Sequence, residues 1–237
     1  MLNKELLYNT IKDYKIKVDD EAFKRLDKYA ELLVETNKQF NLTAITEPDD
    51  MTIKHFADCL TVFNAVDFNE NSKIIDVGTG AGFPGLVMLM VRPDLDITFL
   101  DGTGKKLIFI EKVMDMSGVS GKILHRRAED AGLDPQYREK FDFATARAVA
   151  KLTTLCEYCL PFVKTGGCFI SMKSSDVNEE ISDAESAIEI LGGKLTENKM
   201  FDLVENTQRR IVLIKKISQT PSKYPRASSK ISKNPLK

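Results

Sequence analysis

The chain has 237 residues, of which 43% are hydrophobic, and its formal net charge is −1. This length and hydrophobic content fit one full α/β domain with a sizeable core and an attached subdomain. The longest apolar run, residues 86–91, is far too short to cross a bilayer, and the N-terminal stretch lacks the apolar core of a signal peptide. We therefore expect a cytoplasmic protein with no membrane partner.

The charge is unevenly distributed along the chain. From Arg209 to the C-terminus there are nine Lys and Arg residues and no Asp or Glu, which leaves 25 basic against 35 acidic residues before it. An acidic body with a basic end suggests that a polyanion is met near that end. A merely solubilising tail is the alternative, and charge alone does not decide between the two.

Residues 1–70 are predicted to form a helical N-terminal subdomain. Asp19 or Asp20 can cap a helix whose apolar residues recur at spacings of three and four, and we expect a second helix after Pro48. Between the two helices, residues 40–43 have the composition of a turn.

From Lys73 onward, short apolar strands alternate with helices, which predicts a mostly parallel sheet covered on both faces. The last two strands are joined by only a short link, residues 205–208, so they must form a hairpin and one of them must be antiparallel. We expect this α/β core over residues 71–217 and a flexible, basic C-terminal tail over residues 218–237. The expected strands are 73–78, 96–101, 122–126, 141–147, 167–173, 198–204 and 209–217, with helices near 84–92, 104–117, 151–163 and 176–191.

Two of the four cysteines, Cys156 and Cys159, form a CxxC pair on a predicted helix. No second pair stands at zinc-site spacing, so two buried thiols are favoured over a metal or redox site. We expect no metal.

The stretch IIDVGTGAGFPGL, residues 74–86, carries four glycines between a strand and a helix. Glycines let a ligand approach the backbone, and Asp101 at the end of the next strand is placed to accept bonds from ribose hydroxyls. The pattern therefore predicts a nucleoside-containing cofactor. Asp76 leads the loop and would suit the ammonium and sulfonium of S-adenosylmethionine while opposing a pyrophosphate. The alternative for Asp76 is a carboxylate that caps the loop through backbone amides.

Several motifs together resemble one family, the GidB family (glucose-inhibited division protein B, also called RsmG) of bacterial 16S ribosomal RNA guanine-N7 methyltransferases. These motifs fall in order along nearly the whole chain: NLTAI at 41–45, HFADCL at 55–60, DVGTGAGFPG at 76–85, VRP at 91–93, RAED at 127–130, ARA at 146–148 and KYPR at 223–226. The resemblance implies the Rossmann-like class I methyltransferase fold, a seven-stranded sheet with an antiparallel last strand. It implies transfer of a methyl group from S-adenosylmethionine to N7 of guanine 527 in the 530 loop, with S-adenosylhomocysteine as product.

The same resemblance assigns residues to the cofactor. The loop would contribute Asp76, Gly78, Gly80, Gly82 and Phe83. The ribose and adenine would be met by Asp101, Gly102, Thr103, Ala128 and Glu129, with Arg147 at the reactive end. The family usually has Asp-Ser-Leu followed by Lys-Arg after the second strand, and Gly102 and Gly104 depart from that pattern. The departure leaves open the contacts of Gly102 and Thr103.

Guanine N7 presents an in-plane lone pair, so the reaction needs alignment and electrostatics and no general base. Arg147, Asn41 and His55 are the candidate catalytic residues. For Arg147 the alternative is a structural salt bridge, for Asn41 a turn cap, and for His55 helix packing. The candidate RNA contacts are Lys173, Arg209, Arg210, Lys223 and Arg226, and Lys173 is equally compatible with contact to water.

Two other functions stay open at this point. A non-catalytic regulator would bind S-adenosylmethionine without turnover, and a methyltransferase for another RNA, a protein or a small molecule would act without 16S RNA. The resemblance favours a monomer that acts on 16S RNA, within the small ribosomal subunit.

Overall fold

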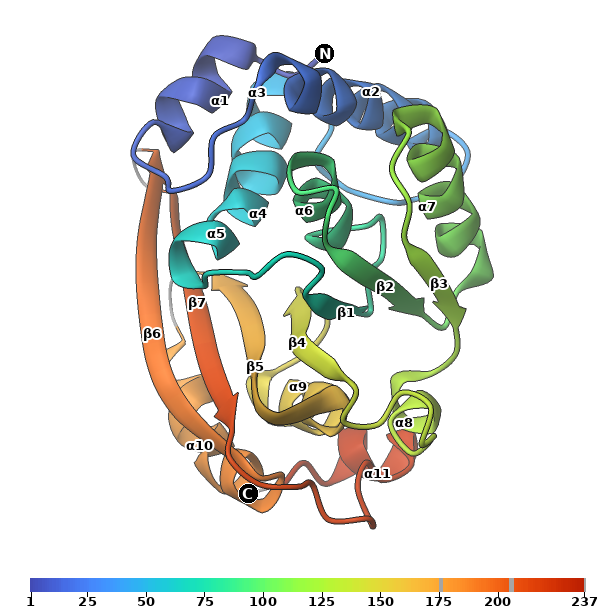
Figure 1. The fold of residues 1–237 in the computed structure, drawn as a ribbon, viewed down its shortest axis with the longest axis vertical. Helices are drawn as coiled ribbons and strands as arrows, with labels where there is room; N and C mark the ends of the chain where they lie inside the picture. Colours follow the sequence, from blue (N-terminus) through green and yellow to red (C-terminus); the bar gives the residue numbers. More distant parts are fainter. Residues whose placement is uncertain (175–176, 205–206, 237) are drawn as a thin grey trace.

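A seven-stranded sheet forms the centre of the computed structural model (Figure 1), which describes residues 1–174, 177–204 and 207–236. The strand order is β3-β2-β1-β4-β5-β7-β6, and β7 runs antiparallel to both of its neighbours. This arrangement confirms the predicted α/β class and the predicted terminal hairpin; positions 205–206 of the predicted link lie outside the described residues. The strands are β1 (Lys73–Val77), β2 (Asp96–Asp101), β3 (Lys122–His125), β4 (Phe141–Arg147), β5 (Val163–Ser174), β6 (Gly193–Val204) and β7 (Thr207–Lys216).

Helices cover both faces of the sheet and bury two separate apolar clusters against it. On one face α6 (Gly85–Val91) and α7 (Gly104–Ser117) pack with the N-terminal helices. On the other face lie α8 (Ala128–Ala131), α9 (Leu152–Cys159), the 3₁₀ turn η2 (Leu160–Phe162) and α10 (Asn178–Ile190). This two-faced cover is what a parallel sheet requires, because its strands are apolar on both sides.

The N-terminal residues are helical, as predicted, and they belong to the same core as the sheet. The Asp19 side chain caps α2 by accepting a hydrogen bond from the Ala22 amide at 2.7 Å. Leu26 and Leu33 of α2 are fully buried in one cluster with Phe99 of β2 and Ile211 of β7. The elements are α1 (Lys4–Ile11), α2 (Asp20–Asn37), α3 (Pro48–Met51), the π-helix η1 (Thr52–Ala57), α4 (Asp58–Leu60) and α5 (Val62–Ala65).

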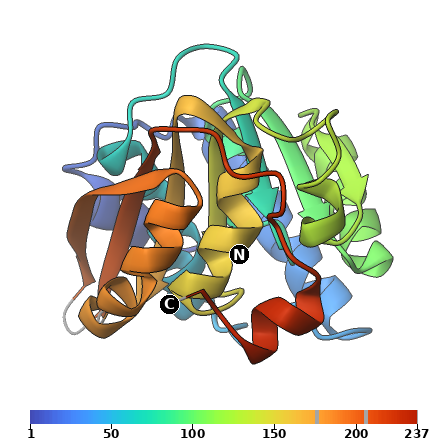
Figure 2. The same cartoon turned by 90° about the horizontal axis from the view of Figure 1, so that it is seen from below.

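The prediction of a flexible C-terminal tail was wrong. Residues 218–236 run along the α9 side of the molecule and end in the short helix α11 (Ser228–Lys233) (Figure 2). Tyr224 and Ile231 are buried, and the Arg226 guanidinium donates to the carboxylate of Glu157 on α9 at 2.7 and 2.9 Å. The composition of this segment suggested disorder, but a few anchoring side chains at the right spacing hold it to the core.

The predicted buried thiols are confirmed. Cys156 and Cys159 are fully buried and free, as is Cys59. Burial raises the pKa of Cys168, which is half-buried on β5, to about 11. Among the residues that the structure describes, no helix is both long and apolar enough to cross a membrane.

Candidate cofactor and active site

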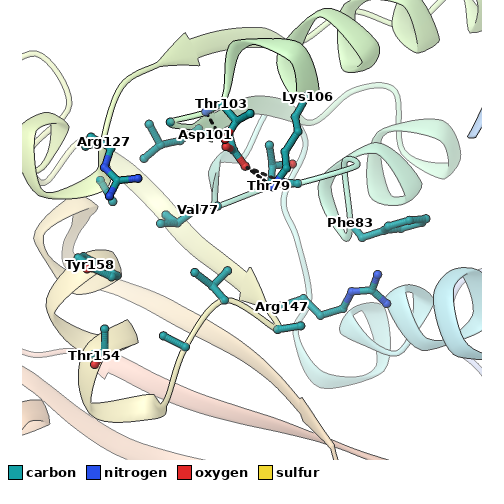
Figure 3. Close-up of a pocket in the computed structure, with 18 of the residues that line it drawn as sticks. Val77, Thr79, Phe83, Asp101, Thr103, Lys106, Arg127, Arg147, Thr154 and Tyr158 are labelled. Atoms are coloured by element: carbon teal, nitrogen blue, oxygen red, sulfur yellow. Dashed lines mark hydrogen bonds and ion pairs between the residues drawn. The ribbon is translucent and has the colours of Figure 1, made fainter. Parts of the chain in front are cut away.

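A cavity of about 1010 Å³ lies at the carboxyl ends of the central strands (Figure 3). Val77 and Gly78 line it from the end of β1, Leu100 and Asp101 from β2, and Arg147 from β4. Open α/β sheets bind their ligands at this edge, where the strand order reverses between β1 and β4. The cavity is large enough for a nucleoside-sized ligand.

The glycine loop forms one wall of this cavity and adopts a backbone that suits glycine. Gly78 and Gly80 line the cavity with φ angles of +68° and +61°. A Cβ on Gly78 would lie 2.9 Å from Cγ2 of Val149, two residues after the end of β4. The glycine loop therefore packs against the turn that follows the ARA motif, and this contact together with the positive φ disfavours a side chain at Gly78.

Asp76 is not among the residues that line the cavity, and its predicted contact with the cofactor stays a prediction. Its side chain is fully buried behind the loop, where one carboxylate oxygen accepts from Thr79 Oγ1 at 2.6 Å and from the Gly85 amide at 3.1 Å. Burial raises the pKa of Asp76 to about 6. Through these two bonds Asp76 ties the loop to the N-terminus of α6, as the loop-capping alternative requires, while its other carboxylate oxygen has no hydrogen-bond partner among the residues that the structure describes. Gly82 likewise lies in the loop without lining the cavity.

Asp101 lines the cavity from the end of β2, and its predicted contact with the ribose stays a prediction. One carboxylate oxygen accepts from the Gly80 amide at 3.1 Å and the other from the Thr103 amide at 2.8 Å, and the residue lines the cavity (Figure 3). Each oxygen keeps a further acceptor site for a ligand hydroxyl. Gly102 and Thr103 also line the cavity. A Cβ on Gly102 would lie 2.9 Å from Cδ of Arg127, so this departure from the family pattern leaves space for the Arg127 side chain.

Two ends of the site are separated in Figure 3: Arg127 and Tyr158 lie at one, and Phe83 and Arg147 at the other. The first end is completed by Ala128 and Glu129, which both line the cavity as the resemblance predicted. Arg127 lies 3.7 Å from the Glu129 carboxylate.

The second end is built around the ring of Phe83. The Arg147 guanidinium lies 4.6 Å from the ring centroid, and the His55 imidazole stacks on the ring at 4.6 Å with an interplanar angle of 28°. The cation–π contact holds the Arg147 guanidinium against Phe83, most strongly where water is excluded, and the stacking holds the His55 ring on Phe83. Arg147 Nη1 also donates to the Lys54 carbonyl at 3.1 Å and to Asp58 at 3.2 Å.

The protonation state of His55 follows from its neighbours. Nδ1 of His55 lies 3.2 Å from Arg147 Nη2, which can only donate, and 3.2 Å from the Lys54 carbonyl, which can only accept, so the two contacts favour opposite tautomers. Nε2 of His55 lies 2.8 Å from Thr43 Oγ1, a hydroxyl that can donate or accept. Burial, followed by the charge of Arg147, lowers the pKa of His55 to about 3. His55 is therefore neutral near pH 7 and orients Arg147 through an uncharged ring.

The π-helical turn η1 delivers His55 to this end of the site. Residues 52–57 are wound as a π-helix between α3 and α4, and such turns are frequent at functional sites because they re-aim single side chains. Asp58 follows directly and is buried between Arg147 and Arg209, which lies 3.4 Å away. Burial raises the pKa of Asp58, and the two guanidinium groups oppose that rise.

The predicted RNA contacts differ in how available they are. Lys173 Nζ is held by the Ala150 carbonyl at 2.9 Å and Glu180 at 2.7 Å, and Arg226 is held by Glu157. Both are engaged in ion pairs within the protein, and their predicted contact with RNA stays a prediction. Arg209 pairs with Asp58, Arg210 lies opposite Lys173 in the β5–β7 register, and Lys223 is exposed.

The predicted role of Asn41 stays a prediction. Asn41 is exposed on the connector before η1 and does not line the cavity, whereas its neighbours Leu42 and Thr43 do. Asn37 holds this connector, because its side-chain oxygen accepts from the amides of Leu42 at 2.7 Å and Thr43 at 3.0 Å.

Several cavity residues were not singled out from the sequence. Thr43 lines the cavity, and Asp58 pairs with the cavity residue Arg147; both lie inside the motif stretches at 41–45 and 55–60, so the motifs themselves carried a signal for them. The cations Lys106, Arg127 and Lys151 and the C-terminal Ser232 and Pro235 also line the cavity. Nothing local in the sequence marks the last two, because they reach the site only through the packing of the tail.

Comparison with known proteins agrees with this site. The family model of rRNA small subunit methyltransferase G (GidB) matches residues 22–212. The chain belongs to this family. It is 45% identical over 237 residues to "Ribosomal RNA small subunit methyltransferase G" of Alkaliphilus oremlandii, covering 99% of each chain. The protein of the same name in Acetivibrio thermocellus is 44% identical, covering 98% of this chain and 96% of the relative.

Membership of the GidB family makes the chain an S-adenosylmethionine-dependent methyltransferase. Among solved structures, an S-adenosylmethionine-dependent O-methyltransferase of Thermotoga maritima is similar with a TM-score of 0.52 and 15% identity, covering 80% of this chain and 72% of the other. At this identity the likeness concerns the fold, which is the class I methyltransferase fold that the resemblance implied.

The residues present fit this cofactor. Asp101 offers free acceptor sites toward the cavity, and Gly78 and Gly80 leave the loop backbone open to close approach. Val77, Leu100 and Ala128 supply apolar lining. An acidic acceptor beside an open glycine loop and apolar lining suits a nucleoside that carries a positively charged sulfonium.

Proposed function

We propose that the protein transfers the methyl group of S-adenosylmethionine to N7 of guanine 527 in 16S ribosomal RNA and releases S-adenosylhomocysteine. We infer further that it acts in the cytoplasm as a monomer on RNA of the small ribosomal subunit. The observation that carries the proposal is the division of the cavity: a carboxylate for ribose at Asp101, and a guanidinium held against an aromatic ring at Arg147. Family membership supplies the choice of RNA as substrate.

S-adenosylmethionine, when bound, supplies a methyl group on a positively charged sulfur. Guanine N7 needs no base, so the task of the chain is to hold the guanine in line and to exclude water. Arg147 is suited to this task, because it still has N–H donors beyond its contacts with Lys54, Asp58 and His55, and guanine presents O6 beside N7 as an acceptor. Neutral His55 fixes the guanidinium without adding a second charge.

RNA phosphates would meet cations at the cavity mouth. Lys106, Arg127 and Lys151 line the cavity, and the Arg127 side chain is 65% exposed. Lys151 is also exposed, and it begins the turn that leads into α9. These cations line the cavity that the guanine must enter, so they can neutralise the flanking backbone.

The proposal is tested on RNA from cells that lack the gene. We expect mass analysis of their 16S RNA to show unmethylated guanine at position 527, and plasmid-borne wild type to restore N7-methylguanine. Plasmid-borne Arg147→Ala should restore far less, and a regulator that binds the cofactor without turnover would restore none in either form. N7-methylguanine at this position in the deletion strain would contradict the proposal.

A second measurement separates the substrates. Purified protein and labelled S-adenosylmethionine are incubated with small ribosomal subunits from the deletion strain, with the same subunits from wild-type cells, and with protein-free 16S RNA. Label should enter RNA from the deletion strain and should not enter RNA that is already methylated. Label appearing in protein or small molecules in place of RNA would favour the other methyltransferase class.

A further inference from the structure

The C-terminal segment reaches the cofactor cavity. Ser232 in α11 and Pro235 just after it line the cavity together with Tyr158 of α9. The Tyr158 hydroxyl lies 3.4 Å from Ser228 Oγ at the start of α11. Because Tyr158 and Arg127 stand at the end of the site away from Arg147, the segment closes the end at which Ala128 and Glu129 also lie (Figure 3).

The segment is held there by buried contacts. Glu157 is fully buried, and its carboxylate accepts from the amide, Nε and Nη2 of Arg226 at 2.7 to 2.9 Å. Arg138 adds bonds from its guanidinium to the carbonyls of Tyr224 at 2.8 Å and Thr220 at 2.6 Å. Ile231, one residue before Ser232, is fully buried.

These anchors fix both ends of the segment. Arg226 and Tyr224 hold its start, and Ile231 holds the helix that presents Ser232. A buried carboxylate that meets three donors at once resists separation, since either partner left alone in the interior is costly. The segment is therefore fixed to the core, whereas a flexible segment that binds RNA would lack buried anchoring contacts.

We propose that residues 228–236 form part of the cofactor-binding site and enclose the adenine end of S-adenosylmethionine. The inference rests on the proposed function, because it assigns the ligand by the same cofactor. It replaces the expectation that the basic tail serves RNA alone. A purine is a flat apolar ring with a polar edge, and Pro235, Tyr158 and the Ser232 hydroxyl offer apolar area and a hydroxyl to such a group.

Two variants and one control test this proposal. Ser232→Phe places a large ring where the small side chain lines the cavity, while Ser229→Phe places the same ring on an exposed position of α11 that does not line it. A third protein ends after Ala227. We would measure the affinity of each for S-adenosylhomocysteine by calorimetry, with the melting temperature recorded alongside.

Ser232→Phe and the truncated protein should bind S-adenosylhomocysteine at least about 10-fold more weakly than the full chain, or about 1.4 kcal/mol. Ser229→Phe should bind as wild type does. If truncation also unfolds the protein, the comparison of Ser232→Phe with Ser229→Phe decides. Equal affinity of Ser232→Phe and wild type for S-adenosylhomocysteine would overturn the proposal that residues 228–236 form part of the cofactor-binding site.

The salt dependence of RNA binding separates the two roles of the tail. If truncation flattens the slope of log affinity against log salt and leaves cofactor affinity unchanged, the tail is an RNA arm and the inference is wrong. Failure of the full-length chain to bind S-adenosylhomocysteine would contradict the proposed function itself. Binding by the full chain with unchanged variants would contradict only the proposal for residues 228–236.

Discussion

Arg147 shows how a single side chain becomes oriented. Its guanidinium meets a carbonyl, a carboxylate, an imidazole and an aromatic ring, contributed by Lys54, Asp58, His55 and Phe83. The planar fork of arginine can satisfy several partners at fixed angles, which the point charge of lysine cannot. Arginine at this position is therefore set in one direction before any substrate arrives.

Removal of the charge at Asp101 should weaken cofactor binding. Asp101→Asn keeps the shape of the side chain but removes the charge that strengthens hydrogen bonds from ribose hydroxyls. The loss of hydrogen bonds to a charged group costs about 1.5–3 kcal/mol, or about 10- to 150-fold in affinity for S-adenosylhomocysteine measured by calorimetry.

Asp96→Asn is the matched control for Asp101. Asp96 begins the same strand that Asp101 ends, and it pairs with Lys122 at the opposite edge of the sheet. We expect its affinity for S-adenosylhomocysteine to equal that of wild type. If Asp101→Asn binds S-adenosylhomocysteine with an affinity within twofold of wild type, Asp101 does not contact the cofactor.

The lowered pKa of His55 predicts a dependence of stability on pH. Below the ordinary histidine pKa of about 6.5, the unfolded chain binds a proton at His55 that the folded chain, with a pKa of about 3, does not. The free energy of unfolding should therefore fall as pH decreases from about 6.5 toward 3. Asp76, whose pKa is raised to about 6, acts with the opposite sign between about pH 4 and 6.

A comparison with His55→Gln isolates the histidine, because Asp76 is common to both proteins. Between pH 6 and pH 5 wild type should lose about 1 kcal/mol more of its unfolding free energy than the variant does. Urea unfolding at both pH values measures this difference. Parallel losses in the two proteins would mean that His55 titrates normally in the folded chain.

At the scale of elements, the conformation of the loop between β1 and α6 depends on two carboxylates and on the space around its glycines. Asp76 at the end of β1 binds the first amide of α6, and Asp101 at the end of β2 binds the Gly80 amide. The carboxylates of Asp76 and Asp101 thus hold the loop at two points, the Gly85 amide and the Gly80 amide. Its glycines differ, however, in what surrounds them.

Gly80 and Gly82 should therefore tolerate alanine differently. Both have positive φ, which costs a residue with a Cβ about 1–2 kcal/mol. Around Gly80 the nearest atom to a Cβ would be 3.8 Å away, whereas at Gly82 it would lie 2.7 Å from Cγ of the fully buried Leu86. Overpacking adds about 1–3 kcal/mol, so in urea unfolding Gly82→Ala should cost more than Gly80→Ala. Equal costs would show that Leu86 can move aside.

At the scale of the whole molecule, the cavity is bounded by parts that lie far apart in the chain. The connector at 42–43 and η1 come from the N-terminal helices, the loops come from the sheet, and Ser232 and Pro235 come from the C-terminal segment. Cofactor and RNA must therefore approach one opening between these layers. The exposed cations at that opening give a measurable consequence.

Arg127→Ala and Lys151→Ala should each lower the salt dependence of RNA binding. Each phosphate contact that is lost reduces the slope of log affinity against log salt by about 0.7 to 0.9. Filter binding with small ribosomal subunits at several salt concentrations measures the slope. Lys164→Ala is the control, because Lys164 is also exposed but lies near the start of β5, at the opposite edge of the sheet. A slope that changes as much in the control as at the cavity mouth would place the RNA elsewhere.

The sequence by itself determined the sheet, the glycine loop and the places of Asp101 and Arg147. These depend on short-range pattern: alternating strands and helices make a parallel sheet, and in such a sheet the carboxyl ends of the central strands meet at one edge. The last residues of β1, β2 and β4, which are Val77, Asp101 and Arg147, all line the same cavity in accordance with that rule.

Only the tertiary structure decided what lies across the site from those strands. Asp76 accepts from the Gly85 amide, His55 contacts Arg147 across 92 residues of sequence, and Arg226 contacts Glu157 across 69 residues. Such contacts depend on which buried partners happen to face each other once the layers pack, and local periodicity holds no information about that. The C-terminal segment has a composition typical of disordered chains, yet its residues Ser232 and Pro235 line the cavity. The buried ion pair between Arg226 and Glu157 holds the segment in that place.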